Sequence, residues 1–172
     1  MAVVPVLKSH QEDWSRKFED EAAAVREAVG REALAIHHIG STAIPGILAK
    51  PIIDMLVEVA SLEGLDRHAA SLEALGYECL GEFGIPGRRY LRKDDARGVR
   101  THQIHAFASG SPHLRRHLAF RDYLRAFPEV AHDYSELKRG LAATCGGNLD
   151  AYIAGKDPFI KAVEQDALRW AG

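Results

Sequence analysis

Hydrophobic positions along the chain recur at helical spacing in some segments and form short apolar runs in others, and this difference separates expected helices from expected strands. From about Ser9 to Val29 the apolar residues recur every three or four positions, which predicts an amphipathic helix that ends at Gly30. Two short apolar runs follow, at residues 33–39 and 52–59, and they predict strands separated by a loop that contains two glycines and a proline. The first third of the chain is therefore expected to be a helix and two strands.

The middle of the chain continues this pattern. Leucines and alanines at helical spacing between residues 65 and 75 predict a helix that ends at Gly76, and residues 77–83 are expected to form a strand. Residues 88–93 and 99–107 then flank a turn-rich segment, which indicates an antiparallel hairpin.

After Phe107 the periodicity is helical to the end of the chain. Ser111 and Pro112 are typical of a helix start, Pro128 begins a second helix, and the pair Gly146-Gly147 ends it. Asp157 and Pro158 are expected to cap a last helix. Strands in the middle with helices on either side predict an α+β fold, in which helices pack on a mixed or antiparallel sheet.

Length and composition indicate one ordinary globular domain, over residues 1–172. The formal charge of −2 does not point to nucleic acid or to an anionic membrane as a partner. No window is apolar enough for a membrane span, and Cys79 and Cys145 have neither metal-ligand nor disulfide spacing. We therefore expect a cytoplasmic protein, whose oligomeric state the sequence leaves open.

Basic residues are nevertheless unevenly distributed, and they gather in the hairpin and in the helix that follows it. The group comprises Arg88, Arg89, Arg92, Lys93, Arg97, Arg100, Arg115, Arg116, Arg121 and Arg125. A local positive surface on a nearly neutral protein suits a small anionic ligand better than a long polyanion. A solvated hairpin and a solvated helix face explain most of these residues equally well.

The loop between the first two strands contains the residues with the clearest chemistry. Gly40 and Ser41 directly follow an apolar strand, where backbone N–H groups can bind phosphate oxygens, and the hydroxyls of Ser41 and Thr42 add donors. Asp54 lies within an otherwise apolar strand, where a carboxylate is costly unless it is paired, protonated or bound to a metal such as Mg²⁺. Lys50, just before that strand, is a further candidate for binding phosphate.

Residues 38–46 (HIGSTAIPG) followed by residues 49–54 (AKPIID) closely resemble the signature of the GrpB family. By sequence that family is placed in the nucleotidyltransferase superfamily, and a related domain is fused to some bacterial dephospho-CoA kinases. The resemblance extends over essentially the whole chain, through Arg89, His105, the segment 120–125 with Arg121, Tyr134 with Lys138, and the segment 152–156 with Lys156.

The resemblance implies a nucleotidyltransferase-like α/β core with extra C-terminal helices, and it implies roles for individual residues. Gly40, Ser41 and Thr42 would bind phosphates and Asp54 would hold Mg²⁺. The basic residues that would bind the nucleotide or stabilise its charge are Lys50, Arg89, Arg121, Lys138 and Lys156. His105 would act as a metal ligand or general base, because its strand is expected to neighbour that of Asp54.

Position 56 departs from the pattern of active nucleotidyltransferases. These enzymes have a second carboxylate two residues after the first, on the same strand face, and this chain has Leu56 there. Three functions therefore stay open. The chain could be a Mg²⁺-dependent nucleotidyltransferase with an unknown acceptor, a module that binds a nucleotide or another phosphorylated metabolite without catalysis, or an enzyme that uses His105 and Asp54 as an acid–base pair on a small polar substrate.

Overall fold

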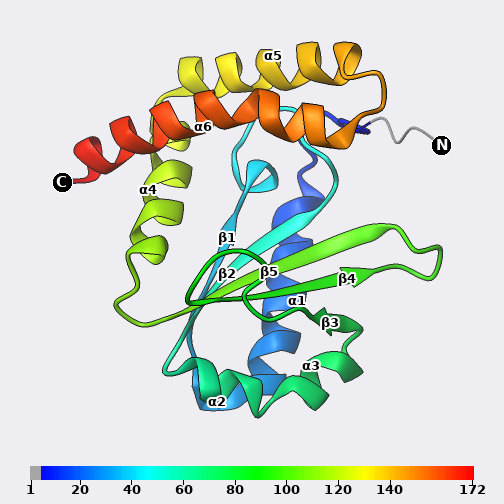
Figure 1. Ribbon diagram of the computed structural model, residues 1–172, viewed down its shortest axis with the longest axis vertical. Coiled ribbons are helices and arrows are strands. Elements are labelled where there is room, and N and C mark those ends of the chain that lie inside the picture. Colours follow the sequence, from blue (N-terminus) through cyan, green and yellow to red (C-terminus); the bar gives the residue numbers. More distant parts are fainter. Residues whose placement is uncertain (1–4) are drawn as a thin grey trace. The chain divides into compact units, whose positions relative to one another are not determined.

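A computed structural model describes residues 5–172 of the chain, and it has the α+β fold that the sequence predicts (Figure 1). The described residues form two compact units. The sheet unit comprises residues 12–40 and 52–114, and the helical unit comprises residues 5–11, 41–51 and 115–172. Each unit has its own candidate chemistry, so the two are described in turn.

The sheet unit is organised around five strands in the order β1-β2-β5-β4-β3. Their bounds are Ala33–Ile39 for β1, Ile53–Val59 for β2, Tyr77–Cys79 for β3, Arg88–Asp94 for β4 and Arg100–Ala108 for β5. Strands β2 and β5 are parallel and the other neighbours are antiparallel, so the sheet is mixed, as expected. The predicted hairpin is confirmed as β4 and β5. Strand β3 is shorter than predicted, because the chain turns away after Cys79 into a glycine-rich segment.

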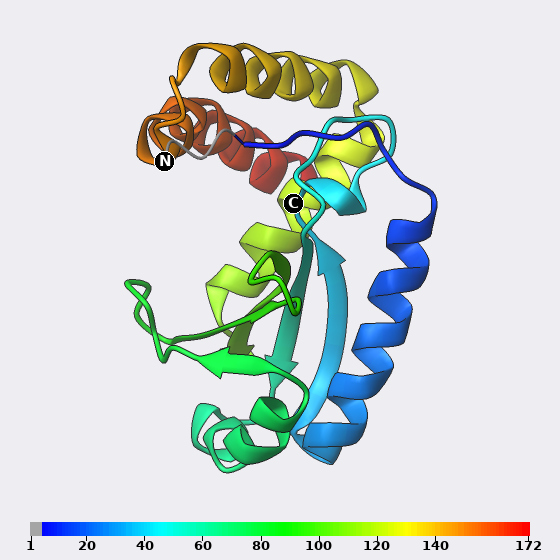
Figure 2. The same ribbon diagram turned by 90° about the vertical axis from the view of Figure 1, so that its right-hand side faces the viewer.

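Helix α1, Asp13–Val29, lies against one face of the sheet along β1 and β2 (Figure 2). Its buried side chains are those of the predicted apolar stripe, Trp14, Phe18, Ala22, Val25 and Val29. The ring of Phe18 stacks on His38 of β1 with the ring centroids 4.8 Å apart. The helix begins four residues later than the periodicity predicts.

Strand β2 is buried on both faces. Met55, Leu56 and Val57 are each at most 1% exposed, and consecutive residues of a strand point to opposite sides of the sheet. The helix expected between residues 65 and 75 is instead two short helices, α2 (Leu62–Asp66) and α3 (Ala69–Ala74). The Ser61 hydroxyl caps α2 by accepting a hydrogen bond from the backbone N–H of Gly64.

The helical unit contains most of α4 (Pro112–Ala126) together with α5 (Pro128–Thr144) and α6 (Leu149–Ala171). Helices α5 and α6 run side by side (Figure 1). Residues 41–51 belong to this unit, since Ile44 and Ile47 are part of its buried core with Leu124, Ala131, Tyr134 and Val163. The backbone N–H of Leu48 also donates to the Ser135 hydroxyl at 2.9 Å.

The predicted start of the last helix is wrong. Helix α6 begins at Leu149, where the Asn148 side chain accepts a hydrogen bond from the N–H of Ala151, and it continues through Pro158. Asn148 follows Gly146-Gly147 directly and provides a strong N-cap. Proline deprives the carbonyl four residues earlier of its partner, but that carbonyl belongs to the exposed Ala154. Water can satisfy it there, so the helix tolerates Pro158.

Candidate functional site

Asp54 and His105 lie next to each other on the sheet. Strand β2 pairs with β5 in parallel, and Leu56 is in register with His105, so the expected neighbouring strands are confirmed. The Nε2 atom of His105 is 3.4 Å from Oδ1 of Asp54. Their side chains are 16% and 24% exposed, so the pair is reachable from solvent.

Arg88 completes this cluster, and the sequence did not single it out from the other basic residues. Its Nη1 is 3.4 Å from Nδ1 of His105, and the side chain is buried. Because a guanidinium can only donate hydrogen bonds, Nδ1 accepts from Arg88, and Nε2 carries the proton that faces Asp54. Both imidazole nitrogens thus have a partner, and in this geometry His105 orients the carboxylate of Asp54.

Gly40 lies against the same carboxylate. Its backbone φ is +74°, and a Cβ atom at this position would be 2.5 Å from Oδ2 of Asp54. Glycine is therefore required both for the backbone conformation and for the space that Asp54 occupies. This contact was not foreseen from the sequence, which indicated only that Gly40 could expose its N–H to phosphate.

The donor set around Asp54 does not match a dedicated Mg²⁺ site. Mg²⁺ prefers six oxygen ligands, and two-metal phosphoryl transfer uses several carboxylates. Leu56, where the second carboxylate would be, is completely buried. Within residues 5–172, no three His, Cys, Asp or Glu side chains are grouped so that they could hold a metal ion. Asp54 could supply only one of the ligands, and phosphates and water would have to supply the others.

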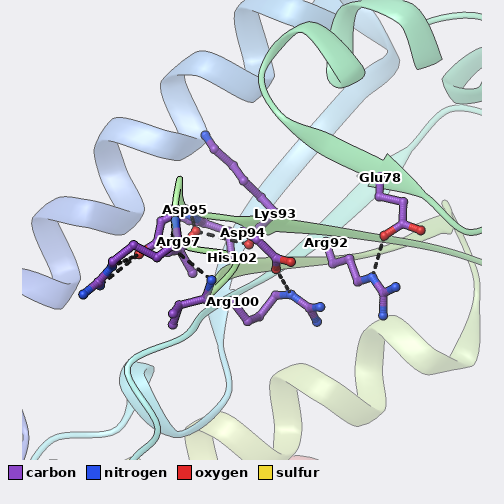
Figure 3. Close-up of polar contacts among 10 residues, drawn as sticks. Glu78, Arg92, Lys93, Asp94, Asp95, Arg97, Arg100 and His102 are labelled. Carbon is purple, nitrogen blue, oxygen red and sulfur yellow. Dashed lines mark hydrogen bonds and ion pairs between the residues drawn. The ribbon is translucent and has the colours of Figure 1, made fainter.

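The basic hairpin is largely neutralised by acidic residues. Figure 3 shows Arg92 bonded to Glu78, Arg100 to Asp94 and Arg97 to Asp95. Arg89, expected to bind an anionic ligand, instead forms two hydrogen bonds with the carboxylate of Asp66, at 2.8 and 3.0 Å. These ion pairs favour the second interpretation of the hairpin, a solvated and internally balanced surface.

A deeper group of charges lies between α1 and the sheet. Glu21 of α1 accepts hydrogen bonds from the Tyr77 hydroxyl at 2.8 Å and from Lys93 at 2.9 Å, and His102 is 3.8 Å away. Burial raises the pKa of Glu21, but the bonds from Lys93 and Tyr77 outweigh it and the pKa is lowered. Burial lowers the pKa of His102, although Glu21 opposes this shift. The network fastens α1 to the sheet.

The helical unit contains the second candidate cluster, in which three predicted lysines converge. Lys138 of α5 is 2% exposed and donates hydrogen bonds to the Ser41 hydroxyl, at 2.9 Å, and to the carbonyl of Leu48. Lys50 and Lys156 both lie over the ring of Tyr152, at 5.6 and 4.6 Å from its centroid. The structure thus brings together Ser41 and three of the predicted phosphate-binding residues.

Burial and neighbouring charge oppose each other at Lys138. Its amine lies 4.6 Å from the centroid of Tyr134, and this ring favours the ammonium form, as do the acceptors of the two hydrogen bonds. Burial, and then the positive charges of Lys156 and Lys50, disfavour it more strongly and lower its pKa to about 7. An anion at this cluster would offset the charge repulsion.

Tyr152, between Lys50 and Lys156, has an unsatisfied hydroxyl. The side chain is completely buried, and the hydroxyl has no hydrogen-bond partner among the described residues. Burial raises its pKa to about 12, so the hydroxyl keeps its proton and remains a donor. Buried polar groups nearly always have partners, so this unpaired hydroxyl is an exception among the side chains of residues 5–172.

The remaining predicted residues are placed as follows. Thr42 is buried directly after Ser41 in a short 3₁₀ turn. Arg121 of α4 forms an ion pair with the adjacent Asp122 at 2.8 Å, and its charge contributes, after burial, to the lowered pKa of Arg125. The Nε of Arg125 donates to the carbonyl of Ala43 at 2.9 Å, so this arginine helps to hold the loop.

Comparisons with known proteins agree on one family. The family model described as "GrpB protein" matches residues 4–166. A UPF0157 protein, YqkA of Bacillus subtilis, is 47% identical over 94% of this chain, and the match covers 46% of that protein. The glutamate-rich protein GrpB of Alkalihalophilus pseudofirmus is 34% identical, with 92% of each chain covered. The chain thus spans about half the length of the first relative and nearly all of the second.

A third relative is part of a larger enzyme. The dephospho-CoA kinase of Mycobacterium tuberculosis is 35% identical over 84% of this chain, and the match covers 41% of the kinase.

The described residues contain no helix long and apolar enough to cross a membrane.

Solved structures support the same assignment. The crystal structure of the conserved protein GrpB from Enterococcus faecalis matches with a TM-score of 0.91 and 42% identity, covering 96% of this chain and 99% of that one. The Cid1 poly(U) polymerase matches with a TM-score of 0.52 at 12% identity over 76% of this chain and 42% of Cid1, which shows a shared nucleotidyltransferase-like fold. By its family model, its relatives and its fold, the chain belongs to the GrpB family.

Proposed function

We propose that this protein binds a phosphorylated small molecule of the nucleotide class, and that the lysine cluster of the helical unit binds its phosphates. The observation that carries this proposal is the convergence of Lys50, Lys138 and Lys156 beside the Ser41 hydroxyl. Among residues 5–172 the ammonium of Lys138 is paired with no carboxylate, so its contacts leave the positive charge uncompensated. Phosphate oxygens supply both negative charge and hydrogen-bond acceptors.

The relatives add a second candidate ligand to the nucleotides. A similar segment occurs within proteins described as dephospho-CoA kinases. A phosphorylated metabolite from the neighbourhood of coenzyme A chemistry is therefore included with the nucleotides as a candidate ligand. This choice rests on analogy with the fused relatives, whereas the anionic character of the ligand rests on the lysines.

Ligand-induced stabilisation tests the proposal directly. Tripolyphosphate, the four ribonucleoside triphosphates and coenzyme A precursors are each added, with and without EDTA, and the Tm is measured. A ligand that binds only the folded state stabilises it by about 2.7 kcal/mol at a concentration of 100 Kd. We expect stabilisation that survives chelation, because lysines and not a metal hold the phosphates.

A matched pair of lysine variants identifies the site. Lys156→Met should weaken phosphate binding about 10- to 150-fold, since one charge-assisted contact is worth roughly 1.5–3 kcal/mol. Lys161→Met is the control, because Lys161 lies on the same helix but is exposed and paired with Asp157. Equal losses in both variants, or no stabilisation of the wild type by any phosphate, would refute the assignment.

The Asp54–His105 pair favours a second candidate function, which is catalysis at Asp54. The partly exposed carboxylate is oriented by His105 and could accept a proton from a small polar substrate. If that substrate is the acceptor of a nucleotidyl group, its deprotonated oxygen attacks the α-phosphorus of a triphosphate and pyrophosphate leaves. Asp54 would supply one ligand to a Mg²⁺ ion, which would supply stabilisation of the developing negative charge.

Label transfer separates catalysis from binding. The protein is incubated with α-labelled triphosphates, Mg²⁺ and a panel of small acceptors, and labelled product is measured. Under the second candidate Asp54→Asn abolishes transfer while tripolyphosphate binding persists. The absence of turnover with any of the four triphosphates would leave the binding function alone.

A further inference from the structure

The glycine-rich segment between β3 and β4, residues 80–87, presents one aromatic side chain to solvent. Phe83 is 57% exposed, although exposed phenylalanine is unfavourable in water. Its backbone φ is +48°, and no other non-glycine residue within residues 5–172 has a positive φ. A bulky residue in this region is strained, and such strain concentrates at sites that bind ligands.

The buried Arg88 maintains this conformation. Its guanidinium donates to the carbonyl of Glu82 at 3.1 Å and to the carbonyl of Phe83 at 2.8 Å. Gly81 and Gly84 flank Phe83 with positive φ, and a Cβ atom at either would meet open space. The glycines therefore serve the backbone conformation and not close packing, and the segment positions Phe83 facing outward.

One face of the Phe83 ring packs on a group of side chains that includes His105 and Asp54. Its ring stacks on Tyr90 with the centroids 5.1 Å apart and the planes within 18°. Tyr90 is buried, its ring is 5.5 Å from that of His105, and His105 contacts Asp54. Arg88 also lies over Tyr90, at 5.0 Å from its centroid. One face of the Phe83 ring is thus fixed by an ordered cluster, and the opposite face is open to solvent.

We propose that the outer face of Phe83 binds the planar heteroaromatic ring of a small ligand by stacking, as a nucleobase would. This assignment rests on the proposed function only in naming a nucleoside-type ring, and it requires no phosphate. A small planar ring fits better than a protein partner, because Phe83 is the one exposed large hydrophobic side chain of residues 80–87, where Leu80 and Ile85 are partly buried. These residues form no broad apolar patch of the kind that protein interfaces bury.

Tryptophan fluorescence reports stacking without any need for phosphate. In Phe83→Trp the new indole is the probe, and it is compared with wild type, whose tryptophans are Trp14 and Trp170. Adenosine and uridine, which have no phosphate, should quench the new indole, whereas tripolyphosphate should not. Absence of quenching by all nucleosides and nucleotides would overturn the proposal.

Affinity measurements then test the native side chain. Phe83→Leu keeps an apolar group but removes the π face, and Phe83→Gly relieves the strain. Both should weaken the binding of adenosine and uridine about tenfold while leaving tripolyphosphate binding unchanged, since stacking of one base on an aromatic side chain contributes roughly 1–3 kcal/mol. Leu34→Ala, at a residue of β1 that is 52% exposed, is the control and should change neither affinity.

The outcomes separate this inference from the proposed function. Loss of tripolyphosphate binding with retained nucleoside stacking would contradict the lysine site and support the Phe83 site. Equal adenosine and uridine affinities in wild type, Phe83→Leu and Phe83→Gly would overturn the Phe83 site and leave the lysine site intact. A fall in dimer content of Phe83→Gly in sedimentation, with unchanged nucleotide binding, would also overturn it in favour of self-association.

Discussion

At the scale of single residues, the site in the sheet unit depends on close approaches that involve Gly40 and Asp54. Asp54 is placed by its strand, but its carboxylate is confined by the backbone of Gly40 on one side and by His105 on the other. The sequence marks both residues as chemically suggestive, and it contains no sign that they touch. Arg88, adjacent to the predicted Arg89, contacts His105, because neighbouring residues of a strand point to opposite faces.

Gly40→Ala should destabilise the fold and displace Asp54. The alanine would have a φ of +74° and a Cβ atom 2.5 Å from Oδ2 of Asp54. The backbone strain alone costs about 1–2 kcal/mol. Gly46→Ala is the control, because Gly46 has a φ of +79° but a Cβ there would have no neighbour within 4 Å. Chemical denaturation should show a larger loss for Gly40→Ala, and equal losses would contradict the proposed contact.

At the scale of elements, the last helix shows how a local signal can be overruled. A proline within a periodic segment usually ends or begins a helix. Helix α6 instead begins nine residues before Pro158 and includes it, because Asn148 caps the earlier start and Tyr152 and Val163 are buried on either side of the proline. Burial of residues on both sides of Pro158 favours a continuous helix more than the proline opposes it.

Pro158→Ala should stabilise the protein. The change restores an N–H donor for the carbonyl of Ala154 and removes the steric conflict of the ring, so a gain of about 1–3 kcal/mol is expected in the free energy of unfolding. Pro128→Ala is the matched control, since Pro128 is the first residue of α5, where proline is favourable. A loss of stability in Pro158→Ala would mean that packing of α6 requires the proline.

At the scale of the whole molecule, each unit has a buried charged group whose pKa is shifted, Glu21 with His102 in the sheet unit and Lys138 in the helical unit. The two groups titrate in different pH ranges. In the sheet unit, the lowered pKa values of Glu21 and His102 mean that the unfolded chain binds protons more readily as the pH falls. In the helical unit, the lowered pKa of Lys138 also makes stability rise with pH, but between pH values of about 7 and 10.5, the ordinary pKa of lysine.

Stability should therefore rise with pH in two separate steps. Loss on the acid side begins below 6.5, the ordinary pKa of histidine, and continues below 4.5, where Glu21 becomes protonated. Above pH 7 the wild type should gain stability, at up to about 1.4 kcal/mol per pH unit for one proton. Thermal melts from pH 4 to 9 should show that Glu21→Gln changes only the acid step and Lys138→Met only the upper one. If Lys138→Met retains the upper step, then Lys138 is not its source.

The sequence by itself determined the order and type of the elements. The apolar stripe of α1 followed from helical spacing, the strands β1 and β2 from short apolar runs, and the hairpin from its turn-rich connection, because each of these signals belongs to neighbouring residues. The family resemblance also identified Ser41, Lys138 and Asp54 as candidates. The sequence did not predict contacts between distant segments, since these depend on which strands pair and which helices touch.

Only the tertiary structure decided how the candidate residues group. It brought the lysines together around Tyr152, placed Arg89 on Asp66, and put Arg88 beside His105. It also showed that Phe83, which no periodicity distinguishes, is held outward by Arg88 and Tyr90. Charge balance and side-chain contact are three-dimensional quantities. The chain's pattern could therefore name the charged residues, but only the fold could show which of them form ion pairs with carboxylates.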